Sequence, residues 1–387
     1  MRPRPKDVLR PAVRVLTVLA VAVGLLLPAG AAVAAAPVPM PGTTLVLSVS
    51  TTRVTHGSDL RLTATLRSAE TGLAVPDAEV VLEHRRPGSG AYAPLATLVT
   101  DAAGVVRLVT KPTFTAEYAA RFAGNGVLAP SATAAQRVDV AHNLTARLSK
   151  AAARVGSQVT LTGSVSPAHP GATVRIERYF DGRWRLVTSR TLSSASTYRA
   201  LLTTPTTKGW TRYRVVMAAD RDHLAKTTAL PRLDSFRLHT YVVAKRGTVG
   251  VSMPDFAAAV AATYADPRGW VRGHDRFRQV TSGGRFTVVM SQARYLPSYS
   301  SVCSVQYSCR VGRYVIINQD RWRYGSRYFT GSLAQYRQMV VNHETGHWLG
   351  NGHAYCRGKG RPAPVMQQQS KGMQGCEPNA WPLTGEL

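Results

Sequence analysis

Short runs of alternating apolar and polar residues fill residues 43–140 of the chain. One run places Leu45, Leu47 and Val49 at every second position. A period of two, interrupted by turns of Gly, Pro and Asp, is typical of half-buried antiparallel strands. The pattern therefore predicts a β-sheet fold for this segment.

Residues 141–232 repeat this plan. GSDLRLT at 57–63 matches GSQVTLT 99 residues later, and AEVVLE at 78–83 matches ATVRIE 94 residues later. A unit of this length has the size of an immunoglobulin-like (Ig-like) sandwich. Because neither half contains a Cys pair, both resemble the disulfide-free Ig-like modules of bacterial surface and secreted proteins. They serve either as spacers or as binders of a ligand or the cell wall.

The periodicity changes after a connector at 226–234 that is rich in Lys, Arg and Pro. Helical spacing predicts a helix over 253–264, and apolar runs predict buried strands at 286–290 and 314–317. Ser332 and Gln335 have the spacing of a capping box that opens a second helix. Helices and strands therefore mix in an α+β domain.

The N-terminus has the layout of a secretory signal peptide. Basic residues precede an apolar run, Val15–Leu27, and a small-residue tail with Ala32-Val33-Ala34 as its cleavage site. An uncleaved anchor is the alternative, but the run is short against the roughly 20 residues that span a bilayer. We expect a secreted or extracellular protein, either free or associated with the envelope, without a transmembrane segment after cleavage.

The composition supports this picture and adds a strong positive charge. The 387 residues exceed one small domain, and 44% hydrophobic with 18% charged residues exclude a disordered chain. The net charge is +27, of which the signal peptide carries +4. Such a surface favours anionic wall or envelope material as a partner, or is merely well solvated. The basic residues are scattered and no nucleic-acid-binding motif is present.

Export changes the meaning of the four cysteines, which all lie near the C-terminus. An even number of cysteines in a secreted chain predicts disulfides, and we expect the two local pairs, Cys303 with Cys309 and Cys356 with Cys376. A metal site formed by the thiols is the competing interpretation.

The second helix runs into NHETGHWLGNGH at 342–353, where chemistry is concentrated. His343 and His347 lie four residues apart on one helical face, and Gly350 can end the helix and return the chain, so that His353 becomes a third ligand. Three imidazoles leave a Zn²⁺ ion with an open fourth position for water. Glu344 would act as the general base toward that water. The other seven histidines show no clustered spacing and receive no role.

HExxHxxGxxH is the signature of the metzincin clan of zinc endopeptidases, and the C-terminal segment resembles that clan. The resemblance implies a Met-turn beneath the zinc, with Met366 as its residue and Met373 as the alternative. Over 236–387 the chain also resembles a little-characterised family of secreted actinobacterial proteins. The supporting motifs include DPRGW at 266–270, APVM at 363–366 and NAWP at 379–382.

The sequence therefore predicts a multidomain protein with two all-β Ig-like sandwiches and an α+β metzincin-like zinc peptidase domain. The expected division is a signal peptide at 1–34, Ig-like modules at 43–140 and 141–232, and a catalytic domain at 236–387. The expected function is a secreted zinc endopeptidase with one catalytic Zn²⁺ and a peptide or protein substrate. The alternative is a cell-surface adhesin or wall-binding protein with a non-catalytic zinc domain.

Overall fold

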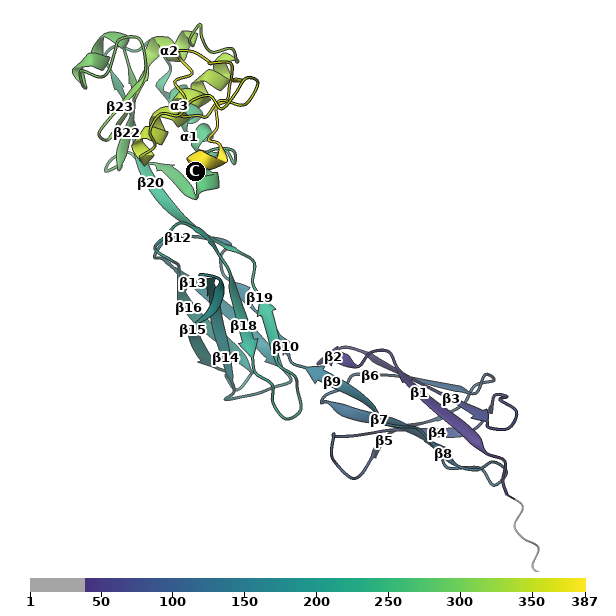
Figure 1. Ribbon diagram of the computed structural model, residues 1–387. Coiled ribbons are helices and arrows are strands. Elements are labelled where there is room, and N and C mark those ends of the chain that lie inside the picture. Colours follow the sequence, from purple (N-terminus) through teal and green to yellow (C-terminus); the bar gives the residue numbers. More distant parts are fainter. Residues whose placement is uncertain (1–38) are drawn as a thin grey trace, which may run out of the picture.

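The computed structural model describes residues 39–387 and forms three units in a row (Figure 1). Each unit encloses its own hydrophobic core, and the chain is mostly β-sheet, with two Ig-like β-sandwiches in its first two units. The expected signal peptide at 1–34 lies outside the described residues. Within 39–387, no helix is long and apolar enough to cross a membrane.

The first module packs two sheets against each other. Their strand orders are β1-β3-β6 and β2-β9-β7-β4-β5, with β8 on β7. The strands are β1 (Thr43–Val49), β2 (Arg53–Thr55), β3 (Leu60–Ser68), β4 (Glu79–Arg85), β5 (Ala93–Val99), β6 (Val105–Thr110), β7 (Ala116–Phe122), β8 (Ser131–Ala132) and β9 (Gln136–Ala141).

The second module has the same two-layer plan. One sheet pairs β13 with β10, β11 and β16, and the other has the order β15-β14-β18-β19. The strands are β10 (Asn143–Leu144), β11 (Arg147–Leu148), β12 (Ala152–Arg154), β13 (Gln158–Ser166), β14 (Thr173–Phe180), β15 (Arg183–Thr191), β16 (Thr197–Thr203), β17 (Gly209–Thr211), β18 (Tyr213–Met217) and β19 (Lys226–Ala229).

The internal repeat read from the sequence is visible in the backbone. β4 shifts register against β5 between Leu82 and Glu83, and β14 shifts against β15 between Ile176 and Glu177, 94 residues later. Bulges at matching positions are regular features of these strands rather than defects, and they show that the two modules share one backbone plan. The Asp181-Gly182 hairpin turn also forms, with positive φ at both residues as a type I′ turn requires.

The third unit combines a largely parallel sheet with helices. β20 (Leu233–Arg246), β22 (Phe286–Ser291) and β24 (Tyr314–Asn318) run parallel, β21 (Asp275–Gln279) joins β20 in parallel, and β23 (Cys309–Val311) is an antiparallel edge. The helices are α1 (Met253–Ala265), α2 (Gln319–Tyr324) and α3 (Leu333–Leu349), with 3₁₀ turns at Trp270–Gly273, Ala293–Ser298 and Thr384–Glu386.

The expected connector at 226–234 is not a linker, and this corrects the sequence interpretation. Lys226–Ala229 is strand β19, and the 14-residue β20 begins at Leu233 inside the second module's core. The start of β20 pairs with β12 and β17, and its later residues pair with β21 and β22. One continuous strand therefore joins the second module to the third unit (Figure 1).

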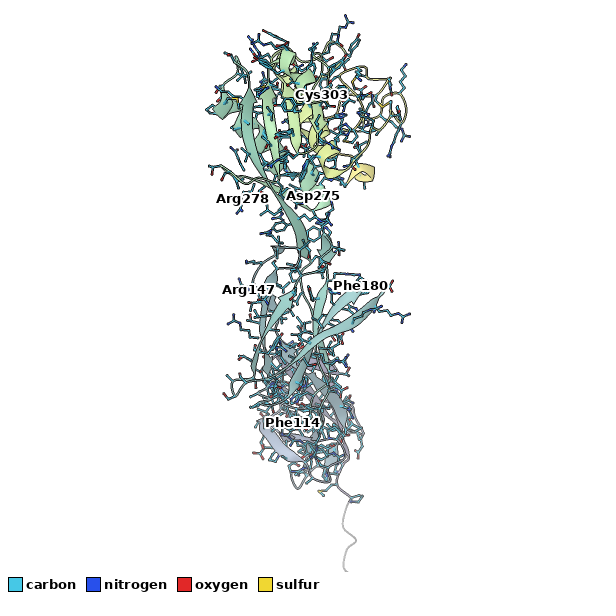
Figure 2. The ribbon with its side chains drawn as sticks, turned by 90° about the vertical axis from the view of Figure 1, so that its left-hand side faces the viewer. Phe114, Arg147, Phe180, Asp275, Arg278 and Cys303 are labelled. Atoms are coloured by element: carbon cyan, nitrogen blue, oxygen red, sulfur yellow. A yellow bond between two sulfur atoms is a disulfide. The ribbon has the colours of Figure 1, made fainter. Side chains whose placement is uncertain are left out.

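Buried ionic contacts surround this strand at the neck between the units, where Figure 2 labels Asp275. The Asp275 carboxylate accepts hydrogen bonds from His239 Nε2 at 2.7 Å and from Lys208 Nζ at 2.5 Å. Burial alone would raise the pKa of Asp275, but these two donors outweigh it and lower the pKa below its ordinary value. Lys208 belongs to the second module, so this ion pair bridges the neck.

We expect Asp275→Asn to flatten the acid dependence of stability. Because the folded-state pKa of Asp275 is depressed, its contribution is present above about pH 4 and is lost as pH falls through the folded value. The free energy of unfolding from urea titrations should therefore fall less steeply below about pH 5 in the variant than in the parent. Asp59→Asn, at an exposed carboxylate, is the control. Equal slopes in parent and Asp275→Asn would contradict this role.

Candidate metal centre

Helix α3 carries the HExxH segment and has defined ends. Ser332 and Gln335 form the expected capping box, in which each side chain bonds the other residue's backbone N–H. Gly350 follows the helix with φ 107°, and its N–H bonds the carbonyl groups of Gly346 and His347. This left-handed residue turns the chain back toward the helix.

The turn brings three imidazole rings together. His347 Nε2 lies 3.2 Å from His343 Nε2 and 3.2 Å from His353 Nε2. Four tetrahedral ligands about 2.05 Å from zinc would stand roughly 3.3 Å apart. The three nitrogens therefore already have the spacing of ligands around one ion.

Two backbone carbonyls fix the direction of these rings. The Nδ1–H of His343 donates to Val365 O at 2.8 Å, and the Nδ1–H of His347 donates to Asn351 O at 2.9 Å. Because a neutral imidazole has one N–H, both Nε2 atoms then carry lone pairs. Burial, with the neighbouring histidines adding repulsion, lowers the pKa of His343 to about 3, and burial also lowers the pKa of His347. The rings are thus prepared as neutral donors.

A C-terminal glutamate that sequence reasoning missed supports this arrangement. Glu386 accepts hydrogen bonds from the backbone N–H of Val365 at 3.0 Å, of Met366 at 2.8 Å and of Leu383 at 2.7 Å. It thereby holds the turn whose Val365 carbonyl orients His343. Its position, more than 30 residues beyond the motif, gave no local signal.

Met366, the residue expected in a Met-turn, packs against Gly346 of α3. It is buried, and a Cβ at Gly346 would come within 2.3 Å of the Met366 sulfur and 2.8 Å of the Trp270 ring. The Trp270 Nε1–H bonds Asn342 O at 3.2 Å, so the ring is held in place. Met373, the alternative, is partly buried against the same core.

Glu344 lies beside the three rings and lines the same pocket. The pocket measures about 320 Å³, and both Glu344 and His343 are buried at its base. Burial raises the pKa of Glu344 to about 8, partly countered by the charge of Arg310. Arg310 also donates to His347 O at 2.8 Å. The site thus combines three nitrogen donors, one carboxyl group and a basic wall.

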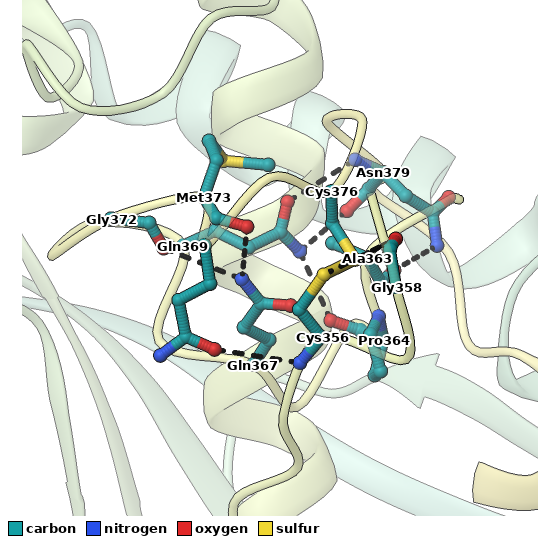
Figure 3. Close-up of a disulfide and its surroundings, with 11 residues drawn as sticks. Cys356, Gly358, Ala363, Pro364, Gln367, Gln369, Gly372, Met373, Cys376 and Asn379 are labelled. Atoms are coloured by element: carbon teal, nitrogen blue, oxygen red, sulfur yellow. Dashed lines mark hydrogen bonds between the residues drawn. A yellow bond between two sulfur atoms is a disulfide. The ribbon is translucent and has the colours of Figure 1, made fainter. Parts of the chain in front are cut away.

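Both predicted disulfides form. Cys303 pairs with Cys309, and Cys309 lines the pocket wall. Cys356 pairs with Cys376 and closes the segment that contains Met366 (Figure 3). Within that segment the Gln367 amide donates to Gly372 O and Met373 O, which fixes the loop below the rings.

The third unit and the end of the second module match a known protein family. Residues 205–382 match a family described as "Protein of unknown function (DUF3152)". No curated protein matches the sequence.

Two solved structures show a low-scoring likeness to part of the chain. The "D0-D1 domain of Intimin" is 15% identical with a TM-score of 0.21, over 49% of this chain and 97% of that one. The Yersinia pseudotuberculosis adhesin InvE is 15% identical with a TM-score of 0.23, over 50% of this chain and 58% of that one. Neither likeness bears on function.

The metzincin assignment made from the motif is wrong. The family that matches 205–382 is not described as a peptidase. The motif specifies three ligands and one helix end, which leaves the surrounding framework undetermined. An α+β metzincin domain is likewise unsupported, and the match begins at 205, inside the second module rather than at 236.

We expect Gly346→Ala to destabilise the third unit. The added methyl group meets the Met366 sulfur and the fixed Trp270 ring, and overpacking of this kind costs about 1–3 kcal/mol. Gly352→Ala is the matched control, since nothing lies within 4 Å of its Cβ. Urea unfolding followed by tryptophan fluorescence measures both, and equal midpoints for the two variants would contradict the close approach.

Proposed function

We propose that the third unit is a zinc-dependent hydrolase that cleaves peptide bonds outside the cell. The observation that carries this proposal is the convergence of the Nε2 atoms of His343, His347 and His353 beside Glu344 in an open pocket.

The residues fit zinc better than any arrangement without a cation. His347 Nε2 lies 3.2 Å from each of the other two Nε2 atoms, and unprotonated nitrogens at this distance repel one another unless a positive charge lies between them. Imidazole suits Zn²⁺, and three protein ligands are the number found in catalytic zinc sites, whereas structural sites use four. When bound, the ion supplies Lewis acidity toward water and a carbonyl oxygen.

Glu344 supplies the proton transfer. Its carboxylate lies next to His343 on α3 and faces the same pocket as the three rings. Burial raises the pKa of Glu344, but the charge of a bound divalent cation would favour its ionised form. In that form it would accept a proton from the attacking water and deliver that proton to the departing amine. Arg310 and Lys371 line the pocket and add positive charge near a developing oxyanion.

The disulfides support an extracellular setting for this activity. Disulfides form and persist in oxidising compartments, and the described chain contains two. We therefore infer a secreted or envelope-associated enzyme with a peptide or protein substrate.

A second candidate is a surface adhesin or wall-binding protein. The two Ig-like modules precede the third unit in a row, which would hold that unit away from an attached surface (Figure 1). A net charge of +27 favours anionic wall material. This function needs no hydrolysis.

We expect Glu344→Gln to retain zinc and to lower peptide hydrolysis by about 10²- to 10⁴-fold, because the base is removed and the three ligands remain. Cleavage of a peptide library and metal content by mass spectrometry measure the two properties. Glu70→Gln, at an exposed site in the first module, should match the parent. Undiminished turnover in Glu344→Gln would refute the mechanism.

The second candidate predicts binding that does not depend on Glu344. Parent and Glu344→Gln should cosediment equally with anionic cell-wall polymer, and added salt should weaken both because it screens exposed charges. Recovery of both proteins entirely in the supernatant at low salt would rule out wall binding.

A further inference from the structure

A second group of histidines meets near the junction of the two Ig-like modules. The spacing of His142, His169 and His223 in the sequence indicated no role for them, but the fold brings the three side chains together. Together with Asp220 they offer ligand atoms that all lie within 4.8 Å of one another. They are separated by up to 81 positions in the chain, so no local spacing reveals them.

Three connections supply these side chains. His142 is the single residue between β9 of the first module and β10 of the second. His169 lies between β13 and β14, and Asp220 and His223 lie between β18 and β19. Tertiary folding of the second module therefore assembles the cluster around His142, the residue at which the chain passes from the first module to the second.

His169 faces two acceptors. Its Nδ1 lies 2.8 Å from the Pro167 carbonyl oxygen, and its Nε2 lies 2.7 Å from Asp220 Oδ2. A neutral imidazole has only one N–H, which the carbonyl takes, because a carbonyl can only accept. In the neutral ring the Nε2 lone pair then points at a carboxylate, an arrangement that either a proton or a metal ion between the two atoms satisfies.

His223 has the same arrangement with its nitrogens exchanged. Its Nε2 lies 2.8 Å from Thr113 O of the first module, and its Nδ1 lies 3.0 Å from Asp220 Oδ1 and 3.2 Å from Oδ2. The Thr113 carbonyl takes the N–H, so Nδ1 also presents a lone pair to the carboxylate.

His142 completes the group as a fully buried ring without a partner. It is 0% exposed, and within 39–387 neither ring nitrogen has a hydrogen-bond partner. Its Nε2 lies 3.5 Å from Asp220 Oδ2. Buried polar groups almost always have partners, so an unpaired imidazole directed at this carboxylate indicates a missing ligand.

Asp220 is itself held in place. The backbone N–H groups of Asp222 and His223 donate to its Oδ1 at 2.8 Å and 2.7 Å. Oδ2 is left to face His169 and His142. Partners of this kind orient the ligands of metal sites.

We propose that His142, His169, His223 and Asp220 bind a structural Zn²⁺ ion. Three imidazoles and one carboxylate provide four ligands, which is the closed set typical of structural zinc. The histidine nitrogens of His169 and His142 lie 2.7 Å and 3.5 Å from Asp220 Oδ2, and all four ligand atoms lie within 4.8 Å of one another, against the roughly 3.3 Å between ligands of a tetrahedral site.

This ion would fix the angle between the Ig-like modules. It ties the connecting residue His142 to two loops of the second module. His223 also bonds Thr113, and Asp222 forms a two-pronged ion pair with Arg86 at 3.0 Å and 3.1 Å. Both of these contacts reach the first module, so ordering the loop orders the junction.

The test counts zinc in the full chain after chelation and reloading with Zn²⁺ alone. The parent should take up two equivalents. His347→Ala with His353→Ala should take up one, and adding His169→Gln and Asp220→Asn should leave none. Asp222→Asn in the first double variant is the matched control, because it breaks the ion pair and keeps every ligand, and it should retain one equivalent.

Thermal unfolding with and without zinc distinguishes loss of the metal site from loss of the fold. In the His347→Ala, His353→Ala background, zinc should raise the melting temperature, because an ion that binds only the folded state stabilises it. The shift should vanish when His169→Gln alone is added, at a partly exposed ring that leaves the core intact.

The outcomes separate this proposal from the proposed function. One equivalent in the parent and none in the His347→Ala, His353→Ala variant would overturn the junction site and leave the α3 site standing. One equivalent in both proteins would support the junction site alone. One equivalent of zinc that persists after His169→Gln and Asp220→Asn are added to the His347→Ala, His353→Ala variant would also overturn the proposal.

Discussion

The direction of each imidazole ring is the constraint on which both histidine clusters depend. A backbone carbonyl takes the single N–H of His343, His347, His169 and His223, and the opposite nitrogen is left as a lone pair facing the cluster. Lone pairs that converge in this way can ligate one cation. The same rule therefore underlies both proposed zinc sites, the three-ligand site beside Glu344 and the four-ligand site at the junction of the modules.

Strand β20 belongs to both the second module and the third unit and joins them directly. Its first residues complete the second module, and its later residues form the sheet below α3, so no flexible segment separates the two units. The Lys208–Asp275 ion pair reinforces this neck. The family match from residue 205 includes β17, which pairs with the start of β20, and this explains why the matched unit extends into the second module.

Elements with a strong local signal were predictable. Alternation gave the strands, the repeat gave two modules of one plan, and Ser332 with Gln335 gave the start of α3. The cysteine pairs were also predictable, because nearby partners in an exported chain are the simplest pairing. The metzincin framework was not, since eleven residues of motif say little about the other residues of the unit.

The sequence alone determined the α3 cluster, because helical periodicity and one left-handed glycine place His343, His347 and His353 together without help from distant residues. Only the tertiary structure decided what supports and surrounds them. Glu386 reaches Val365 and Met366 across the fold, and His142, His169, Asp220 and His223 meet because strands from remote positions end at one place. Contacts of this kind depend on the packing of whole sheets, which no local spacing encodes.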